Sequence, residues 1–117
     1  MAPNNKKYEI ADDLILEKDT VYDCDLKVSG NILGKDGNKY SLTVKGNISA
    51  GNITAWNISA RNITAGNISA WNITADDISY YAVCWAYYNI KCKSIVGRRE
   101  HARHFVLDGK VTVKRVD

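Results

Sequence analysis

The chain has 117 residues, 45% of them hydrophobic and 25% charged, a composition typical of one folded domain and unlike that of a disordered chain. It contains no run near the roughly 18 apolar residues of a membrane span, and its N-terminal residues lead into Asp12 and Asp13 instead of an apolar signal core. Cys24, Cys84 and Cys92 do not have the spacing of a disulfide framework. We therefore expect a cytoplasmic protein with free thiols and no membrane contact.

Residues 1–25 contain two short apolar runs, Leu14 to Leu16 and Val21 to Tyr22. Because an open end of a coiled β structure exposes its core and unpaired strand edges, we predict that residues 1–25 form an N-terminal cap. The charge along the chain is uneven. Residues 1–30 hold four basic and seven acidic side chains, whereas residues 91–117 hold eight basic and three acidic ones. The two ends of an elongated molecule would thus carry opposite charge.

Residues 26–45 begin the regular part of the chain. Two alternating segments, Leu26–Lys27–Val28 and Leu42–Thr43–Val44, flank a loop at residues 34–39. Asp36–Gly37 within that loop is a turn signal. We interpret the two segments as parts of longer coils, and we expect the coiled region to extend over residues 26–95.

Residues 46–75 are six consecutive five-residue repeats: GNISA, GNITA, WNISA, RNITA, GNISA and WNITA. A period of five would spread the isoleucines around a helix, and in a long strand it would send successive isoleucines to opposite faces. A corner after every short extended segment returns each Ile, and the Ala two residues later, to one interior. The chain must therefore coil, and stacked coils would align the Asn residues into hydrogen-bonded ladders near the corners.

The Asn-Ile-Ser/Thr pattern of residues 46–79 resembles the pentapeptide-repeat family, whose fold is a right-handed, four-sided β-helix. In that family a small residue stands two positions before the large apolar one, where this chain has Gly, Trp or Arg. Since Trp56, Arg61 and Trp71 are too large for a narrow interior, we place this position outside. The number of sides per coil stays open. With four sides Trp56 and Trp71 would lie on adjacent faces, and with three sides they would stack directly.

Residues 78–95 continue the coils less regularly, through Ile78, Val83, Ile90 and Ile95. Residues 105–113 are predicted to form a closing hairpin about Asp108–Gly109, within a C-terminal cap at residues 96–117. The fold class expected for residues 1–117 is accordingly all-β: one right-handed β-helix or solenoid of stacked pentapeptide-like coils with two caps.

Aromatic and basic side chains are the candidate partner-binding residues. Trp and Tyr at an outward position, together with Arg, are the residue types that dominate interface hot spots. The candidates are Trp56, Arg61, Trp71, Tyr80, Tyr81, Trp85, Arg98, Arg99, His101, Arg103 and His104. The structural alternatives are that the aromatic residues at 80–88 pack over the last coil and that Trp56 and Trp71 only cover a corner.

Cys84, Cys92, His101 and His104 are the residues that could bind a metal or support a nucleophile. The two cysteines lack the close spacing of a zinc knuckle, and a free Cys in a strand is more often a small buried hydrophobe. We therefore expect no metal, no cofactor and no catalytic residue.

The sequence favours a non-enzymatic protein-binding module, such as a bacterial or phage accessory protein that inhibits a host-defence or nucleic-acid enzyme. DNA mimicry through the repeat is disfavoured because residues 46–75 carry a single charge, Arg61. The alternatives are a self-assembling structural protein whose acidic and basic ends meet, and direct nucleic-acid binding through the basic C-terminal end.

Overall fold

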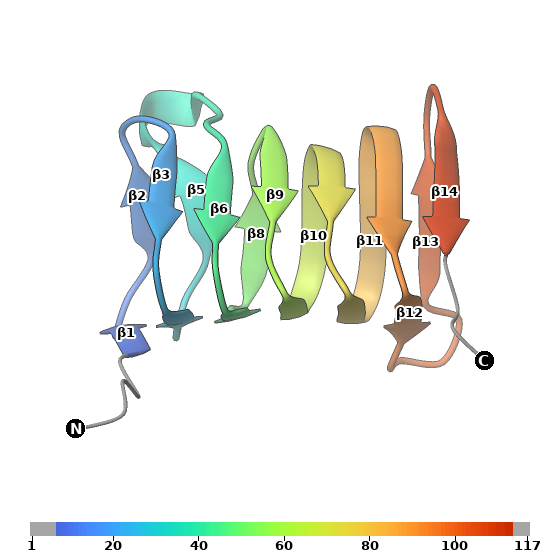
Figure 1. The fold of residues 1–117 in the computed structure, drawn as a ribbon, viewed down its shortest axis with the longest axis horizontal. Coiled ribbons are helices and arrows are strands. Elements are labelled where there is room, and N and C mark those ends of the chain that lie inside the picture. Colours follow the sequence, from blue (N-terminus) through green and yellow to red (C-terminus); the bar gives the residue numbers. More distant parts are fainter. Residues whose placement is uncertain (1–6, 114–117) are drawn as a thin grey trace.

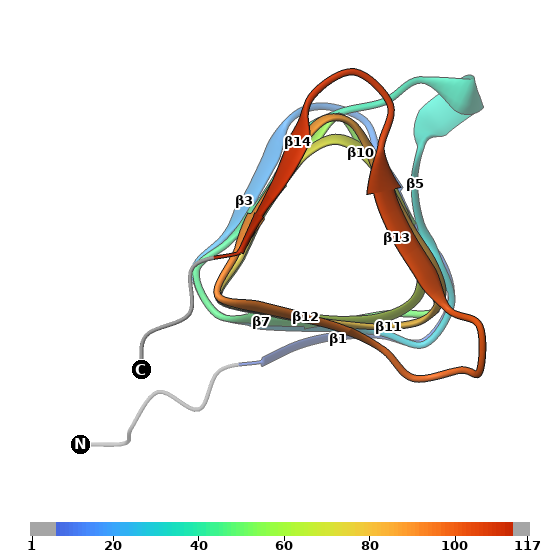
Figure 2. The same cartoon turned by 90° about the vertical axis from the view of Figure 1, so that its right-hand side faces the viewer.

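A computed structural model describes residues 7–113 of the chain as a β-solenoid (Figure 1). Every strand pairing in this region is parallel and joins one coil to the next. Seen along its axis, the solenoid is a triangle of three flat faces and three corners (Figure 2). The expectation of an all-β solenoid is confirmed.

Each face is a stack of six strand segments, one from each coil of the described region. Face 1 contains β1 (Lys7–Ile10), β4 (Asp25–Val28), β7 (Asn47–Ser49), the first parts of β10 (Asn62–Thr74) and β11 (Asp77–Cys92), and β12 (Ser94–Gly97). Face 2 contains β2 (Leu14–Leu16), β5 (Ile32–Gly34), β8 (Asn52–Thr54), the middle parts of β10 and β11, and β13 (Arg103–Val106). Face 3 contains β3 (Thr20–Tyr22), β6 (Leu42–Val44), β9 (Asn57–Ser59), the last parts of β10 and β11, and β14 (Lys110–Val113).

The coil length in the repeat is fifteen residues, because Asn47 pairs with Asn62 and Asn52 with Asn67. Three pentads therefore complete one coil, one fewer than in the family that the sequence resembles. The next coil is longer. Register shifts beyond Ala65 and Ala70 insert one extra residue at each of two corners, so that Tyr87 and Tyr88 together stand opposite Trp71.

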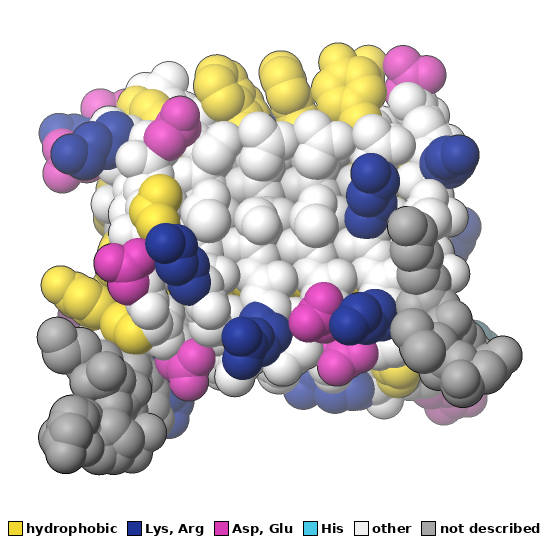
Figure 3. Space-filling view, in the orientation of Figure 1, with side chains coloured by type: hydrophobic (Ala, Val, Ile, Leu, Met, Phe, Trp, Pro, Cys, Tyr) yellow, Lys and Arg dark blue, Asp and Glu magenta, His cyan; other side chains and the backbone are white. Residues whose placement is uncertain are grey.

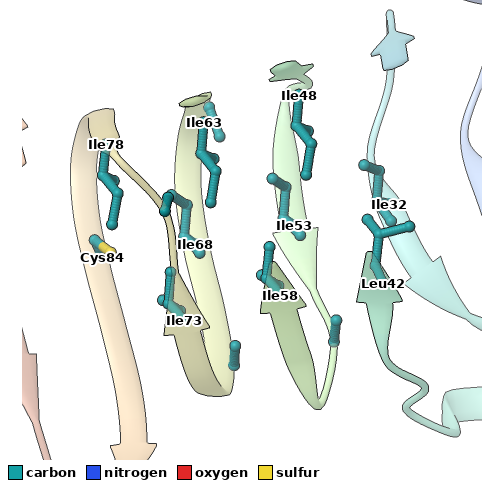
Figure 4. Close-up of a cluster of buried hydrophobic side chains, with 14 of the residues drawn as sticks. Ile32, Leu42, Ile48, Ile53, Ile58, Ile63, Ile68, Ile73, Ile78 and Cys84 are labelled. Carbon is teal, nitrogen blue, oxygen red and sulfur yellow. The ribbon is translucent and has the colours of Figure 1, made fainter. Parts of the chain in front are cut away.

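The interior of the triangle is filled by the repeat isoleucines, which point inward from all three faces (Figure 4). Ile48, Ile53 and Ile58 of one coil are buried, as are Ile63, Ile68 and Ile73 of the next. Ala55, Ala65, Ala70 and Ala75 are buried at the corners, and Ala50 and Ala60 pack partly buried against this core. Small Ala allows the chain to turn sharply without leaving the core, so Ile fills the faces and Ala the corners.

The residues in register with the repeat asparagines, each at or just before the start of a strand segment, form a vertical column on each face, here called a ladder column. Within these columns the Asn side chains bond to one another, as predicted. The Nδ2 groups of Asn62, Asn67 and Asn72 donate to the Oδ1 atoms of Asn47, Asn52 and Asn57 over 2.9, 3.1 and 2.9 Å.

Aspartates stand in the first two coils of the ladder columns: Asp13 and Asp19 begin those of faces 2 and 3, and Asp25 follows Lys7 in that of face 1. Oδ1 of Asp13, Asp19 and Asp25 accepts the backbone N–H of Asn31, Ser41 and Asn47, over 2.8, 2.9 and 2.9 Å. The Asn amides of face 2 continue this pattern, since Asn31 Oδ1 accepts the backbone N–H of Asn52 and Asn52 Oδ1 accepts that of Asn67, each over 3.0 Å. Part of the acidic character of the N-terminal end thus follows from the ladder itself.

The segments expected to form caps contribute strands to the stack. β1, β2 and β3 pair with β4, β5 and β6 as the first coil, and β12, β13 and β14 pair with β11 as the last coil of the described region. The predicted hairpin at residues 105–113 is wrong. Asp108–Gly109 turns a corner of the solenoid, so that β13 and β14 lie on different faces and run parallel to β11.

The loop before β6 departs from the tight corners of the repeat. It contains the short 3-10 turn η1 (Lys35–Gly37), in which Asp36 and Gly37 have φ angles of 55° and 80°. This left-handed conformation explains the Asp-Gly pair, since Gly adopts it without strain and Asp tolerates it better than most residues. Within residues 7–113 no helix is long and apolar enough to cross a membrane.

Candidate functional site

The residue before each ladder column lies at a corner, and the three corners differ in chemistry. Between faces 1 and 2 this position is Gly30, Gly51 and Gly66, linked by backbone hydrogen bonds from Gly51 to Gly30 and from Gly66 to Gly51. Between faces 3 and 1 it is Gly46, Arg61, Asp76 and Lys93, linked in the same way. Between faces 2 and 3 it is aromatic. We call these the glycine corner, the charged corner and the aromatic corner.

The aromatic corner consists of Tyr40, Trp56, Trp71, Tyr87 and Tyr88. The backbone N–H of Trp56 donates to Tyr40 O over 3.0 Å, and that of Trp71 donates to Trp56 O over 2.6 Å. The prediction that the variable repeat position faces outward is confirmed, because Trp56, Arg61 and Trp71 are all exposed.

Four rings of the aromatic corner, those of Trp56, Trp71, Tyr87 and Tyr88, contact one another along the solenoid axis. Trp56 and Trp71 are stacked, with ring centroids 5.3 Å apart and planes inclined by 24°. Trp71 also meets the edge of Tyr88 at 5.8 Å, and Tyr87 and Tyr88 are in edge contact at 4.7 Å. Exposed fractions are 41% for Trp56, 40% for Trp71, 39% for Tyr87 and 38% for Tyr88. This is one continuous, half-exposed aromatic surface across three coils.

Figure 3 shows this surface as a row of hydrophobic side chains along one edge of the molecule. In Figure 1 the backbone corners of β10 and β11 lie lower than the loops between β5 and β6 and between β13 and β14. The aromatic side chains therefore project from the part of this edge where the backbone is lowest. Their neighbours on faces 2 and 3, Thr54, Ser69, Ser59 and Thr74, are uncharged.

The basic candidates lie elsewhere, on the last coil. Arg98 and Arg99 begin the loop at the glycine corner, where their backbone N–H groups bond to the carbonyls of Tyr80 and Tyr81. Arg103 begins β13 on face 2. The structure thus places the arginine and tryptophan candidates at two different corners instead of on one surface.

Arg98 is anchored to the body of the solenoid. Its Nη2 donates to the carbonyl of Ala65 over 2.5 Å, and its guanidinium carbon lies 6.0 Å from the Tyr81 ring centroid. Because Ala65 belongs to the coil two levels below, this side chain ties the loop at residues 98–102 to β10. All three of Arg98, Arg99 and His101 are exposed, but only Arg98 has this anchoring contact, so a structural role accounts for it.

Tyr80 is a core residue, with 1% of its surface exposed. Its hydroxyl lies 2.8 Å from Nδ1 of His104, which enters the interior from β13. Burial raises the pKa of Tyr80, with Cys84 nearby adding to the effect. Tyr80 therefore belongs to the core and is not a binding residue, while His104, its hydrogen-bond partner at the open C-terminal end, remains exposed.

Trp85 and Phe105 form a second, smaller aromatic contact on the outside of face 2, with centroids 6.4 Å apart and planes inclined by 10°. The guanidinium carbon of Arg103 lies 6.0 Å from the Phe105 ring centroid. The candidates named from the sequence lacked Tyr87 and Tyr88, the exposed Phe105, and Tyr40, which is partly buried against the core. Tyr40 could have been found, because it precedes Ser41 as the tryptophans precede Asn57 and Asn72.

Neither buried cysteine is poised as a nucleophile. Burial raises the pKa of Cys84 to about 12, with a smaller contribution from Cys92. Burial also raises the pKa of Cys92, with Asp77 adding to the effect. Both side chains thus stay protonated near neutral pH, and among residues 7–113 no three His, Cys, Asp or Glu side chains come together as a metal site.

An open hollow of about 270 Å³ lies beside the charged corner, where Asp76, Lys91, Cys92 and Lys93 contribute to its wall. Its wall contains two ammonium groups and one carboxylate. Lys93 Nζ and Asp76 Oδ1 lie 3.9 Å apart as an ion pair. Since the Cys92 thiol stays protonated, the hollow holds no activated nucleophile.

Comparisons of the chain with protein-family models, with curated proteins and with solved structures found no match. The class to which the chain belongs therefore follows from its own geometry. It is a triangular β-solenoid built from pentads, three to a coil in the repeat, with an exposed aromatic corner.

Proposed function

We propose that the protein is a non-enzymatic binding protein that docks its aromatic corner onto another protein. The observation that carries this proposal is the continuous contact of Trp56, Trp71, Tyr87 and Tyr88, each about two fifths exposed. The solenoid does not need rings of this size at its corners. At the glycine corner the same position of the repeat is filled by Gly51 and Gly66.

The chemistry around these rings favours a protein partner. Trp and Tyr provide large contact areas and lose little side-chain entropy on binding, and Ser, Thr and Asn provide adaptable hydrogen bonds. Both kinds of side chain occur here, on strands that are fixed by the ladders above and below. Such a surface is already organised before the partner arrives, which lowers the entropic cost of association.

The arrangement of the rings is less suited to stacking on nucleic-acid bases. A base stacks on the free face of an aromatic ring, but the faces of Trp56 and Trp71 are turned toward each other. One face of each tryptophan ring is therefore already occupied by the other ring. The arginines that would neutralise phosphates lie on the last coil, and the loop that begins with Arg98 and Arg99 is at the glycine corner.

We also infer a family relationship and a biological role for this binding protein. The Asn-Ile-Ser/Thr pentads support a relationship in repeat chemistry to the pentapeptide-repeat family, whereas the coil of three pentads separates this chain from it. A rigid solenoid with an uncharged aromatic edge suits an accessory protein or inhibitor that covers a surface of a bacterial or phage target. The weakly charged repeat argues against DNA mimicry as the mode of inhibition.

A capture experiment with a matched control tests the proposal. Tagged wild-type protein, Trp56→Ala/Trp71→Ala and Arg61→Ala are each incubated with nuclease-treated bacterial lysate, and the bound proteins are quantified by mass spectrometry. Arg61 has the same position in its pentad as the two tryptophans but lies at the charged corner. Thermal unfolding of each variant verifies that the solenoid is intact.

We expect a stoichiometric partner that wild type and Arg61→Ala retain and that the double tryptophan variant binds at least tenfold less, as for hot-spot residues. A photo-crosslinking residue at position 56 should join this partner, and one at position 61 should not. Equal binding by a folded double tryptophan variant would show that the aromatic corner is not the docking surface.

A further inference from the structure

The two ends of the described solenoid present complementary strand edges. Within residues 7–113, β2 and β3 pair on one side only, with β5 and β6, while β12, β13 and β14 pair on one side only, with β11. The strands of the first and last coils lie along the same three faces of the triangle, although the last coil projects further at the corners before and after β13 (Figure 2). Unpaired edges of matching shape are templates for further pairing, and a parallel solenoid can continue in the same direction.

Two of the three ladder columns, those of faces 2 and 3, carry opposite charges at these two ends, whereas within residues 7–113 the column of face 1 begins with Lys7 and ends with Ser94. The column of face 2 begins with Asp13 and ends with Arg103 in the described region. The column of face 3 begins with Asp19 and ends with Lys110. All four residues are exposed. Between these ends the two columns contain only uncharged residues: Asn31, Asn52, Asn67 and Val83 on face 2, and Ser41, Asn57, Asn72 and Asn89 on face 3.

The acidic residues retain capacity for a further partner. One oxygen of Asp13 accepts the backbone N–H of Asn31, and one oxygen of Asp19 accepts that of Ser41. A carboxylate has about four acceptor sites. Each of these aspartates can therefore also bind a cation that lies against the open edge of the first coil. At the glycine corner, exposed Asp12 lies at the acidic end and exposed Arg99 at the basic end.

Apolar side chains of the core are uncovered at both ends. At the first coil Tyr8, which is in register with buried Leu26, is 56% exposed and lies in edge contact with Tyr22. At the last coil Val113, in register with buried Cys92, is 40% exposed. Stacking a further coil on either end would bury these side chains as the repeat buries its isoleucines.

We propose that this chain assembles head to tail, with the first coil of one copy stacked on the last coil of another. Arg103 then faces Asp13 of the next copy and Lys110 faces Asp19, each pair in one continuous ladder column. Contact between two identical ends is disfavoured, because it would bring aspartates against aspartates or cations against cations. The surface involved is separate from the aromatic corner, so this assembly and partner docking can succeed or fail independently.

Sedimentation and charge variants test the assembly. Wild type, Arg103→Asp/Lys110→Asp, Asp13→Asn/Asp19→Asn and Arg61→Asp/Lys91→Asp are compared over a range of protein concentrations at low and high salt. The Asn variant keeps the oxygen that accepts the backbone N–H, as Asn52 does in the same column. Arg61→Asp/Lys91→Asp is the control for Arg103→Asp/Lys110→Asp. It also replaces two cations by two aspartates, but at positions outside the first and last coils.

We expect wild type to associate in a concentration-dependent series at low salt and to dissociate at high salt, where screening shortens the Debye length from about 10 Å at 0.1 M to about 3 Å at 1 M. Arg103→Asp/Lys110→Asp should require at least tenfold higher concentration to associate, and Asp13→Asn/Asp19→Asn should associate more weakly than wild type. The control should behave as wild type. A wild type that stays monomeric at low salt, or a control that dissociates equally, would overturn the proposal.

Carbodiimide crosslinking identifies the ends that meet, because it joins a carboxylate directly to an amine. We expect a Lys110–Asp19 link between copies in a mixture of isotopically labelled and unlabelled protein. Within one chain these residues are separated by five coil steps, about 24 Å at about 4.8 Å per step. A linked dimer that joins two N-terminal coils would contradict the head-to-tail arrangement.

Discussion

The side-chain oxygen of Asn62 is buried and accepts no hydrogen bond, because the next residue in its ladder column is Asp77. In the other two columns the corresponding oxygens have donors. Asn67 Oδ1 accepts the backbone N–H of Val83 over 3.1 Å, and Asn72 Oδ1 accepts from Asn89 Nδ2 over 3.3 Å. An ionised carboxylate has no proton to donate, so the ladder is interrupted at Asp77.

Asp77→Asn should stabilise the protein. The new Nδ2 group can donate to Asn62 Oδ1. The retained Oδ1 can still accept the hydrogen bond from Ser94, whose Oγ lies 2.7 Å from Asp77 Oδ1 in the wild-type protein. Satisfying a buried acceptor is worth about 1–3 kcal/mol. We expect urea unfolding to show a higher midpoint with an unchanged slope. Asp76→Asn, which removes a charge from the neighbouring position, is the control and should leave the midpoint nearly unchanged.

Arg98→Ala should destabilise the last coil, whereas Arg99→Ala should not. The guanidinium of Arg98 donates to Ala65 O in a partly buried position, and a hydrogen bond from a charged group contributes about 1.5–3 kcal/mol. Amide hydrogen exchange should show faster exchange in β12 and β13 for Arg98→Ala alone. Equal protection in the two variants would mean that the anchoring contact contributes nothing to the stability of this loop.

The stability of the protein should fall above pH 9, and part of the loss should disappear in Cys84→Ala. The pKa of Cys84 is raised by burial from 9.0 to about 12, so between these values the unfolded chain loses a proton that the folded chain keeps. The contribution is fully present below pH 9 and is lost as pH rises toward 12, by about 1.4 kcal/mol per pH unit. The raised pKa values of Tyr80 and Cys92 act in the same direction in both proteins, and Tyr80 loses only the smaller of its two causes in the variant, so the difference reports mainly on Cys84. Parallel pH profiles for wild type and Cys84→Ala would contradict this assignment.

Gly66→Ala should destabilise the glycine corner. A Cβ at this position would lie 2.8 Å from Gly51 O and 3.2 Å from Asn52 Oδ1, so the coils would have to separate. Without this contact, replacing Gly by Ala would stabilise the protein by about 0.4–1 kcal/mol, because it reduces the entropy of the unfolded chain. The sign of the change in stability therefore shows whether the close contact between the coils dominates. Thermal unfolding should show a lower midpoint for Gly66→Ala and little change for Arg61→Ala, the control at the charged corner.

The amino-acid sequence by itself determined the coil, its inward face and its ladders. A five-residue period is incompatible with a continuing helix or a straight strand, so Ile48 and its repeats had to face one interior, and Trp56, Arg61 and Trp71 had to face outward. The Asn ladders followed from the stacking of identical residues. These features depend on local geometry and repetition, which one sequence contains in full.

The tertiary structure alone decided the number of sides, and with it every relationship between coils. A coil of three pentads stacks Trp56 on Trp71, places Tyr80 in the core beside His104, and separates the arginines from the tryptophans. It also sets Asp13 and Arg103, and Asp19 and Lys110, at opposite ends of the same columns. The angle at each corner results from how Ile and Ala fill the triangular interior together, a collective packing property that the pentad pattern does not contain.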